Sequence, residues 1–390
     1  MDSLLIKNVL LDEKKVNILI EGNRFSRIGV PSDTMAEEMI DAEGKAILPA
    51  FYNTHTHSPM TLMRGYGDDM PLDVWLNEYI WPYEDKMTAA DMHRGSEMAV
   101  KEMIKTGTVF FSDMYFLIDE TIDVVEKAGL RAAIGLTFLT GHSLALQAEK
   151  LDMLAHWQDP TGGRISLTVD PHALYTANAD TYKKCAALCR EQGFKMHTHL
   201  AETDKEVSDC VKETGMTPVR YLDSLGVLGP NVIAAHCVKV DEEEWDILAE
   251  RGVTVAHCPC SNMKLGSGRF PYELAIKSGC RITLGTDGAA SNNNLDLREE
   301  MKFASLLAKV NGDPELLSAE QVFEWATKNG AEAFGIDAGE IKEGKLADAI
   351  LVDMENILMQ PCHNLISNIV YSADSSCIST VICDGKVLKQ

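Results

Sequence analysis

The sequence lacks several features that would assign it to whole classes of protein. No stretch approaches the roughly 18 consecutive apolar residues that a membrane-spanning helix needs. Basic residues are scarce, with 36 Lys and Arg against 59 Asp and Glu and a formal net charge of −23. A surface this acidic repels both nucleic acid and anionic membranes. We therefore expect neither a nucleic-acid partner nor a membrane partner.

A disulfide framework is also missing, although the chain has 10 cysteines. The cysteines lie within apolar segments, as Cys237 and Cys280 do, and the pattern of a signal peptide is absent, so we expect reduced thiols and a cytoplasmic location. Cys258 and Cys260 flank a proline, but no second pair follows at zinc-finger spacing. We interpret them as buried structural thiols.

Along most of the chain, apolar strand candidates alternate with helical segments. No Gly-rich phosphate loop follows the first candidate, which argues against a doubly wound nucleotide-binding sheet. Eight strands alternating with helices over roughly 250 residues match the size of a (β/α)₈ barrel. The candidates are residues 46–50, 108–112, 131–138, 165–169, 195–200, 232–238, 253–257 and 282–285.

Helix signals between these strands support the same fold. The clearest helix is expected at 91–105, where Thr88 and Asp91 have the spacing of a capping box and Gly107 follows the last turn. Residues 311–340 predict additional helices that lead out of the barrel.

Both chain ends predict short antiparallel strands. They are expected at residues 4–6, 16–20, 25–28, 349–352, 369–371 and 381–383, and Asp384 and Gly385 form a strong hairpin pair. Neither end makes a convincing sheet alone, so we expect them to pair. The predicted fold is α/β: a (β/α)₈ TIM-like barrel at residues 49–343, with a small β-sandwich domain formed by both termini, residues 1–48 and 344–390.

Histidines and carboxylates follow the predicted strands. His55 and His57 are spaced by one residue on an extended chain, so both imidazoles point to the same face. The C-terminal ends of barrel strands form the active site of such folds. Three imidazoles with one carboxylate favour a divalent metal such as zinc, with iron and manganese as alternatives. Later strands end in further candidates: His199, Glu202, His236, His257 and Asp287.

Some of these residues have structural alternatives. His197 and His199 point the same way, and we expect the lower one, His197, to pack in the barrel as a core histidine. Glu202 could be a solvated loop carboxylate, Asp287 a helix cap, and His257 either pocket wall or core. The remaining histidines are expected at the surface or in loops: His93, His142, His156 and His363.

With these residues identified, the sequence resembles a known family. Within the amidohydrolase superfamily, the 5-methylthioadenosine/S-adenosylhomocysteine deaminases are similar to it in the stretch GTDGAASN at 285–292, in MRGYGDD at 63–69 with Trp75, and in WPYE at 81–84. The resemblance covers the whole chain. The superfamily motif is carried by His55-x-His57, His199-x-x-Glu202, His236 and Asp287.

The resemblance implies one metal and a hydrolytic reaction. Relatives with two metals bridge them with a lysine from strand four, and residues 165–172, ISLTVDPH, contain none. A single divalent cation held by His55, His57, His199 and Asp287 is therefore expected. The implied reaction converts an adenine nucleoside such as 5′-methylthioadenosine or S-adenosylhomocysteine into its inosine analogue and ammonia. A small-molecule nucleoside substrate and a homo-oligomer are implied as well.

Catalytic and substrate-binding roles follow as hypotheses. Asp287 would take a proton from the attacking water, Glu202 would protonate the ring nitrogen, and His236 would hydrogen-bond the attacking oxygen. The resemblance further implies that Trp75 walls the pocket, Glu84 binds the ribose hydroxyls and His172 contacts the purine, beside Glu202 and Asp287. Two alternatives stay open: an aminohydrolase for another ring, such as 5′-deoxyadenosine, guanine or a triazine, and a non-catalytic amidohydrolase-like scaffold.

Overall fold

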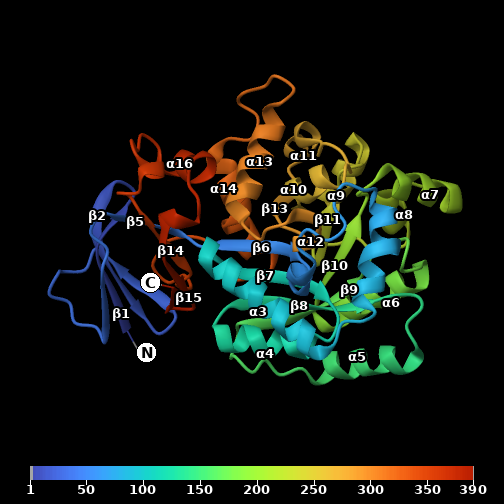
Figure 1. Cartoon of the computed structure of the whole chain (residues 1–390), viewed down its shortest axis with the longest axis horizontal. Coiled ribbons are helices and arrows are strands. Elements are labelled where there is room, and N and C mark those ends of the chain that lie inside the picture. Colours follow the sequence, from blue (N-terminus) through green and yellow to red (C-terminus); the bar gives the residue numbers. More distant parts are fainter. Residues whose placement is uncertain (1–2, 390) are drawn as a thin grey trace.

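The computed structural model describes residues 3–389 and shows a large barrel beside a smaller sheet that contains both ends of the described chain (Figure 1). Eight parallel strands form the barrel, in the order β13-β12-β11-β10-β9-β8-β7-β6. Where β13 meets β6, Thr54 Oγ1 donates to the carbonyl of Leu284 at 2.9 Å, and Asp287 N donates to that of His55 at 3.0 Å. The strands are β6 (Phe51–Thr56), β7 (Thr108–Tyr115), β8 (Arg131–Phe138), β9 (Ile165–Pro171), β10 (Lys195–Leu200), β11 (Val232–His236), β12 (Thr254–His257) and β13 (Arg281–Leu284).

Helices cover the outside of the barrel and pack on its apolar core. The predicted capping box is confirmed: Asp91 N donates to Thr88 Oγ1, and Thr88 N donates to Asp91 Oδ2 at 2.9 Å. The helices around the strands are α3 (Ala89–Thr106), α4 (Ile118–Ala128), α5 (Leu144–His156), α6 (Ala179–Gln192), α7 (Asp204–Thr214), α8 (Pro218–Ser224), α9 (Glu242–Arg251), α10 (Pro259–Lys264), α11 (Tyr272–Ser278), α12 (Ala289–Asn292) and α13 (Leu297–Lys309). The expected helices after the barrel are α14 (Ala319–Ala326) and α15 (Lys328–Ala333).

Between β6 and α3 the chain forms short helical turns over the C-terminal end of the barrel. These are η1 (Ser58–Met63), α1 (Leu72–Val74), η2 (Trp75–Ile80) and α2 (Trp81–Glu84). The stretch η2 has the wider π-helical turn, which is frequent at functional sites. Arg64, in the turn after η1, donates to the carbonyl of Asn293 and to Glu102, so it fastens this segment to the barrel.

The small sheet is built from both ends of the described chain, as predicted. Its order is β16-β15-β14-β5-β1-β2-β3, and β4 pairs with β1. β5 lies antiparallel to β14, with Ile47 opposite Leu351, so the two chain ends share one sheet. Its strands are β1 (Ser3–Leu11), β2 (Lys14–Glu21), β3 (Arg24–Ile28), β4 (Glu38–Asp41), β5 (Lys45–Pro49), β14 (Ala349–Asp353), β15 (Ile378–Cys383) and β16 (Lys386–Lys389). The domain bounds given above stay a prediction.

Two of the expected strands are wrong. The run 46–50 does not open the barrel: it is β5 of the small sheet, and the first barrel strand is β6. Three consecutive residues of β5 are buried, and such a continuously apolar run looks the same in either sheet. Residues 369–371 belong to helix α16 (Leu365–Tyr371), which Asn364 begins by accepting from Ser367 N at 2.7 Å. Packing on α13 and α14 overrides the strand preference of its β-branched residues.

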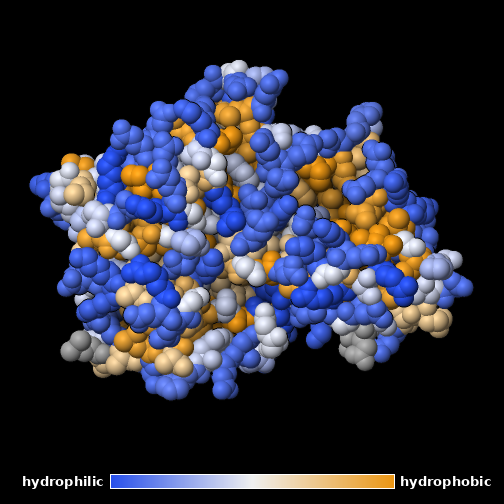
Figure 2. Space-filling view, turned by 180° about the vertical axis from the view of Figure 1, so that it is seen from behind, coloured by the Kyte–Doolittle hydropathy of each residue, from blue (hydrophilic) through white to orange (hydrophobic). Residues whose placement is uncertain are grey.

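The surface agrees with the acidic, charged composition. On the face shown in Figure 2, hydrophilic residues predominate and apolar areas lie between them. Within residues 3–389, no helix combines the length and the apolar character that crossing a membrane requires.

Candidate active site

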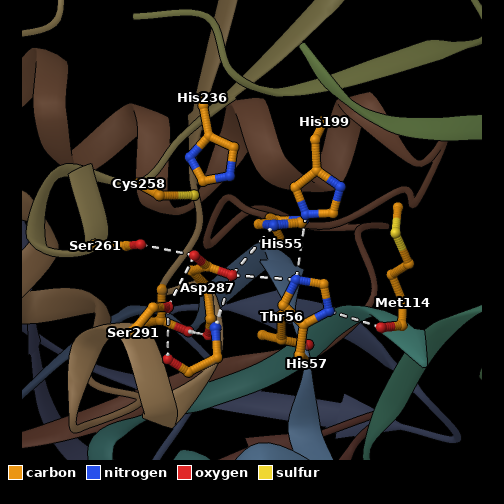
Figure 3. Close-up of polar contacts among 12 residues, drawn as sticks. His55, Thr56, His57, Met114, His199, His236, Cys258, Ser261, Asp287 and Ser291 are labelled. Atoms are coloured by element: carbon orange, nitrogen blue, oxygen red, sulfur yellow. Dashed lines mark hydrogen bonds and ion pairs between the residues drawn. The ribbon is translucent and has the colours of Figure 1, made fainter. Parts of the chain in front are cut away.

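Four histidines and one aspartate meet at the C-terminal end of the barrel (Figure 3). His55 and His57 come from β6, His199 from β10 and His236 from β11, while Asp287 follows β13. All five side chains are buried. His57 Nε2 lies 3.2 Å from Asp287 Oδ1 and 3.3 Å from His199 Nε2, and His55 Nε2 lies 3.4 Å from the same Asp287 oxygen. The structure therefore brings together the whole predicted metal-binding set.

Hydrogen bonds on the far side of the rings decide which nitrogen faces the centre. His57 Nδ1 lies 2.7 Å from the carbonyl of Met114, and His199 Nδ1 lies 2.8 Å from that of His172. Since a carbonyl only accepts, both Nδ1 atoms carry the proton, and in the neutral rings both Nε2 atoms present a lone pair. Two lone pairs 3.3 Å apart repel unless a cation lies between them. This donor arrangement is typical of metal-ligating histidines.

His55 is held in the same way by a second histidine. Its Nδ1 lies 3.0 Å from His197 Nε2, and His197 Nδ1 lies 3.1 Å from Ser112 Oγ. His197 is fully buried, so its prediction as a core histidine below the rim is confirmed. His55 Nε2 is buried without a hydrogen-bond partner among the described residues. Such an orphaned nitrogen, aimed at Asp287, fits a bound cation.

Asp287 is fixed so that one oxygen faces the histidines. Its Oδ2 accepts hydrogen bonds from Ser261 Oγ at 2.7 Å and Ser291 Oγ at 2.9 Å. Burial opposes ionisation, but the neighbouring imidazoles of His55 and His57 outweigh it and hold the pKa of Asp287 well below its usual range. The ionised Oδ1 accepts from Gly288 N at 2.8 Å and keeps a second lone pair for a cation.

The charge of Asp287 acts differently on the two histidines beside it. Burial alone would lower the pKa of His57, but the hydrogen bond and charge of Asp287 outweigh it and raise that pKa to about 9. For His55 burial dominates and lowers the pKa to about 4. The carboxylate thus draws positive charge, either a proton or a metal ion, to the point between itself and His57.

The loop after His57 is anchored by a buried carboxylate of β7. Asp113 accepts from Ser58 N at 2.6 Å, from Ser58 Oγ at 2.9 Å and from Thr56 Oγ1 at 3.0 Å. These bonds hold the residues on both sides of His57 in place.

Glu202 is buried next to this cluster. Its Oε1 accepts from Ser267 Oγ at 3.1 Å, and its Oε2 lies 3.9 Å from His236 Nε2. Burial raises the pKa of Glu202, so the carboxyl group holds a proton more readily than a solvated glutamate would. His236 Nδ1 is paired with Asn262 Oδ1 at 2.8 Å, which leaves its Nε2 free on the side of the pocket.

A pocket opens beside the cluster and is lined by His57, His199, His236, Glu202 and Asp287. None of the described residues that line it is lysine or arginine, and its walls are largely apolar. Three residues named for substrate contacts also line it: Trp75, Glu84 and His172. The remaining walls include Leu72, Leu76, Ile80, Trp81, Phe116, Leu139 and Leu265.

Burial shifts the pKa of two of these lining residues. It raises the pKa of Glu84, against a hydrogen bond from Tyr115, and lowers the pKa of His172 to about 3. His172 is therefore neutral, and its Nδ1 pairs with Thr176 Oγ1 at 2.9 Å. Away from the metal-binding cluster, the described lining offers hydrogen-bonding groups but no lysine or arginine.

Other candidates lie outside the pocket. His257 packs in the core, with Nε2 2.8 Å from Tyr272 Oη and its ring stacked on Phe270 at 4.1 Å. Of its two predicted roles, pocket wall and core, the structure shows the core.

Sequence reasoning missed the groups that orient the cluster: Ser261, Asn262, Ser267 and Ser291. Their only signal is that each is a short polar residue following a predicted strand.

Comparison with known proteins agrees with the geometry. Residues 46–388 match the model of the amidohydrolase family. A 5-methylthioadenosine/S-adenosylhomocysteine deaminase of Archaeoglobus fulgidus is 45% identical over 392 aligned positions, covering 99% of this chain and 93% of the relative. A 5′-deoxyadenosine deaminase of Methanothermobacter thermautotrophicus is 45% identical over 383 positions, covering 96% of this chain and 89% of the relative.

A solved structure shows the same fold. The crystal structure of an adenosine deaminase from Xanthomonas campestris with bound zinc superposes with a TM-score of 0.93 at 32% identity, covering 99% of this chain and 92% of that one. With the family model matching most of its length, the chain belongs to the amidohydrolase family.

Proposed function

We propose that this protein is a metal-dependent deaminase that hydrolyses the 6-amino group of adenine nucleosides. 5′-Methylthioadenosine and S-adenosylhomocysteine are the first substrates to test, since a relative at 45% identity carries those names. The observation that carries the proposal is a buried Glu202, whose pKa burial raises, in the same pocket as the histidine and aspartate cluster. A metal-binding centre beside a general acid is the arrangement that zinc-dependent base deaminases use on another scaffold.

The cation would be held by His55, His57, His199 and Asp287. Zinc fits this set of nitrogen and oxygen donors, with iron and manganese as alternatives, and the similar adenosine deaminase contains zinc. A bound divalent cation supplies Lewis-acid activation of water near neutral pH. The inward lone pairs of the histidines and the orphaned His55 Nε2 support this assignment.

The protein's own groups move the protons of the reaction. Asp287 accepts a proton from the attacking water, while His236 Nε2 hydrogen-bonds the attacking oxygen. Glu202 donates its proton to the ring nitrogen beside C6, which makes C6 electrophilic, and then carries the second proton of the attacking water from the oxygen on C6 to the departing amino group. The proton held by Asp287 restores the carboxyl group of Glu202. One water is consumed and one ammonia released, which leaves the inosine analogue.

The remaining pocket residues would orient the nucleoside. Glu84 would bind the ribose hydroxyls, His172 the purine, and Trp75 would form a wall. The lining holds no lysine or arginine among the described residues, and apolar side chains predominate. This supports faster turnover of nucleosides with an uncharged 5′ group, such as 5′-methylthioadenosine, than of S-adenosylhomocysteine with its carboxylate.

A second candidate substrate is 5′-deoxyadenosine, because relatives named for it are equally similar to this chain. Its 5′ group is also uncharged, so the apolar pocket does not separate it from 5′-methylthioadenosine. Guanine and triazines remain more distant alternatives, since the solved enzymes for those rings are similar at 20–23% identity and show the fold alone.

The test is a substrate panel on zinc-loaded protein, followed by ammonia release. We expect turnover of 5′-methylthioadenosine, and a loss of about 10²- to 10⁴-fold in kcat for Glu202→Gln with metal content unchanged. Glu191→Gln, at an exposed glutamate of α6, is the matched control. Activity on a free base or triazine alone would discard the nucleoside substrate, and a folded protein that binds no metal would favour the scaffold alternative.

We also propose a cytoplasmic location and a homo-oligomer. All 10 cysteines are unpaired and nine of them are buried, which supports a reducing compartment. Phe303, Leu306 and Val310 are exposed along α13 and its C-terminal end, which supports a subunit contact there. Light scattering on purified protein measures the subunit number.

A further inference from the structure

The turn after β10 breaks the alternation of the strand. His197 and His199 point into the barrel, so a continued strand would turn Ala201 inward and Glu202 outward, toward the helices. Ala201 instead has a φ of 49°, in the left-handed region that side chains other than glycine rarely adopt. Glu202 consequently lines the pocket beside His199. The direction in which the Glu202 side chain points therefore depends on a strained turn.

Glu206 holds this turn by two adjacent backbone groups. Its Oε1 accepts from Ala201 N at 2.9 Å, and its Oε2 accepts from Glu202 N at 2.8 Å. The Glu206 side chain lies in the first turn of α7 and the residue is buried, at 7% exposure. On the other side of the turn, the carbonyl of Ala201 accepts from Lys239 N at 2.8 Å. The left-handed residue is thus held at both its N–H and its C=O.

A comparison with α9 shows that Glu206 does more than cap its own helix. Glu244 occupies the same third position of α9 and is equally buried, and it makes the usual capping box by accepting from Asp241 N at 3.0 Å. In α7 the cap Thr203 accepts from Glu206 N, but the Glu206 carboxylate reaches past Thr203 to the two preceding residues. The carboxylate is directed at the turn that carries Glu202.

We propose that Glu206 is a positioning residue for Glu202: its two carboxylate oxygens lock the left-handed turn at Ala201 that aims Glu202 into the pocket. Both oxygens are needed, because a glutamine would present an NH₂ group to one of the two N–H donors. The proposal rests on the proposed function, in which Glu202 transfers the proton. Glu206 itself does not touch the substrate and acts only through Glu202.

The first experiment compares Glu206→Gln with Glu244→Gln on zinc-loaded protein. For Glu206→Gln we expect kcat to fall roughly 10- to 100-fold, part of the effect of a positioned proton donor, with KM within about threefold. Metal content should match the wild type, since the ligands are untouched. Glu244→Gln should keep kcat within about twofold, although it removes an equally buried carboxylate, and thermal unfolding compares the two losses of stability.

The second experiment is a double-mutant cycle with Glu202→Gln. If Glu206 acts through Glu202, adding Glu206→Gln to that variant should change the residual kcat less than about threefold. Independent, multiplying effects would overturn the proposal, as would a Glu206→Gln kcat equal to that of Glu244→Gln. If Glu206→Gln does not fold, Glu206→Asp, which keeps the charge but shortens the reach, should show the same loss at reduced size, and a wild-type kcat there would overturn the proposal.

The proposed function and the positioning role of Glu206 can be refuted separately. A wild-type protein that deaminates no nucleoside overturns both the proposed function and the role of Glu206. A wild type whose activity is lost in Glu202→Gln but retained in Glu206→Gln keeps the proposed function and overturns only the positioning role.

Discussion

Replacing Arg131 by methionine should weaken the junction between the barrel and the small sheet. Arg131 begins β8, and its side chain is 4% exposed. Its Nε donates to Asp348 Oδ2 at 2.8 Å, and its Nη2 donates to Asp384 Oδ1 at 2.6 Å. The Asp348 side chain is fully buried, and its strongest other donors are Tyr52 Oη at 2.6 Å and Asp384 N at 2.7 Å. Without Arg131 a buried carboxylate keeps neutral donors but loses its counter-ion.

The cost of that unpaired charge is about 3–5 kcal/mol in the free energy of unfolding, measured by urea denaturation. Arg251→Met is the control, because it removes a partly exposed, solvent-screened pair with Asp223 and should cost much less stability. Adding Asp348→Asn to Arg131→Met should restore part of the loss, since no charge then stays buried alone. A loss in Arg131→Met no larger than in Arg251→Met would refute this account of the junction.

Two further predictions concern the site and its supports. A Cβ at Gly285 would lie 2.7 Å from His55 Cβ and 3.0 Å from the His55 backbone, so Gly285→Ala should lower both the bound metal and the activity. The control Gly141→Ala has open space around the added Cβ and should keep both, as measured by metal analysis and kcat. Burial raises the pKa of Glu300 to about 8, so between pH 5 and pH 8 the native state keeps a proton that the unfolded state loses. The free energy of unfolding should therefore fall as pH rises through this range, by up to about 1.4 kcal/mol per pH unit. Urea unfolding of Glu300→Gln should lack this fall, and an identical pH slope in the two proteins would contradict it.

The gathering of the site residues could be predicted from the sequence because of one property of barrels. Parallel strands end at the same rim, so polar residues that end separate strands meet in space however far apart they are in the chain. His55, His199, His236 and Asp287 each mark such an end, and the structure places them together. The spacing of His55 and His57 likewise predicted one shared face.

What the sequence could not disclose depends on contacts between distant segments. The run at 46–50 is apolar whether it opens a barrel or pairs with β14, and only the pairing with Leu351 decides. The β-branched residues at 369–371 favour a strand locally, but Tyr371 lies in a helix, where its Oη is 2.6 Å from Ser305 Oγ of α13. The serines that orient Asp287 follow no periodic pattern, so local rules cannot find them.

The turns at the C-terminal end of the barrel show why part of the site's geometry could not be predicted from the sequence. Ala201, His236 and Asp287 all have positive φ angles, although none is glycine or asparagine, and each such residue costs on the order of 1–3 kcal/mol. Each turn is held by a bond from or to a neighbouring strand end, as Asp287 N to His55 O and Lys239 N to Ala201 O show. A local sequence pattern predicts unstrained geometry, so it misses positions where tertiary contacts impose strain. Because these positions aim the side chains at the pocket, their strained backbone is an independent structural sign of the site.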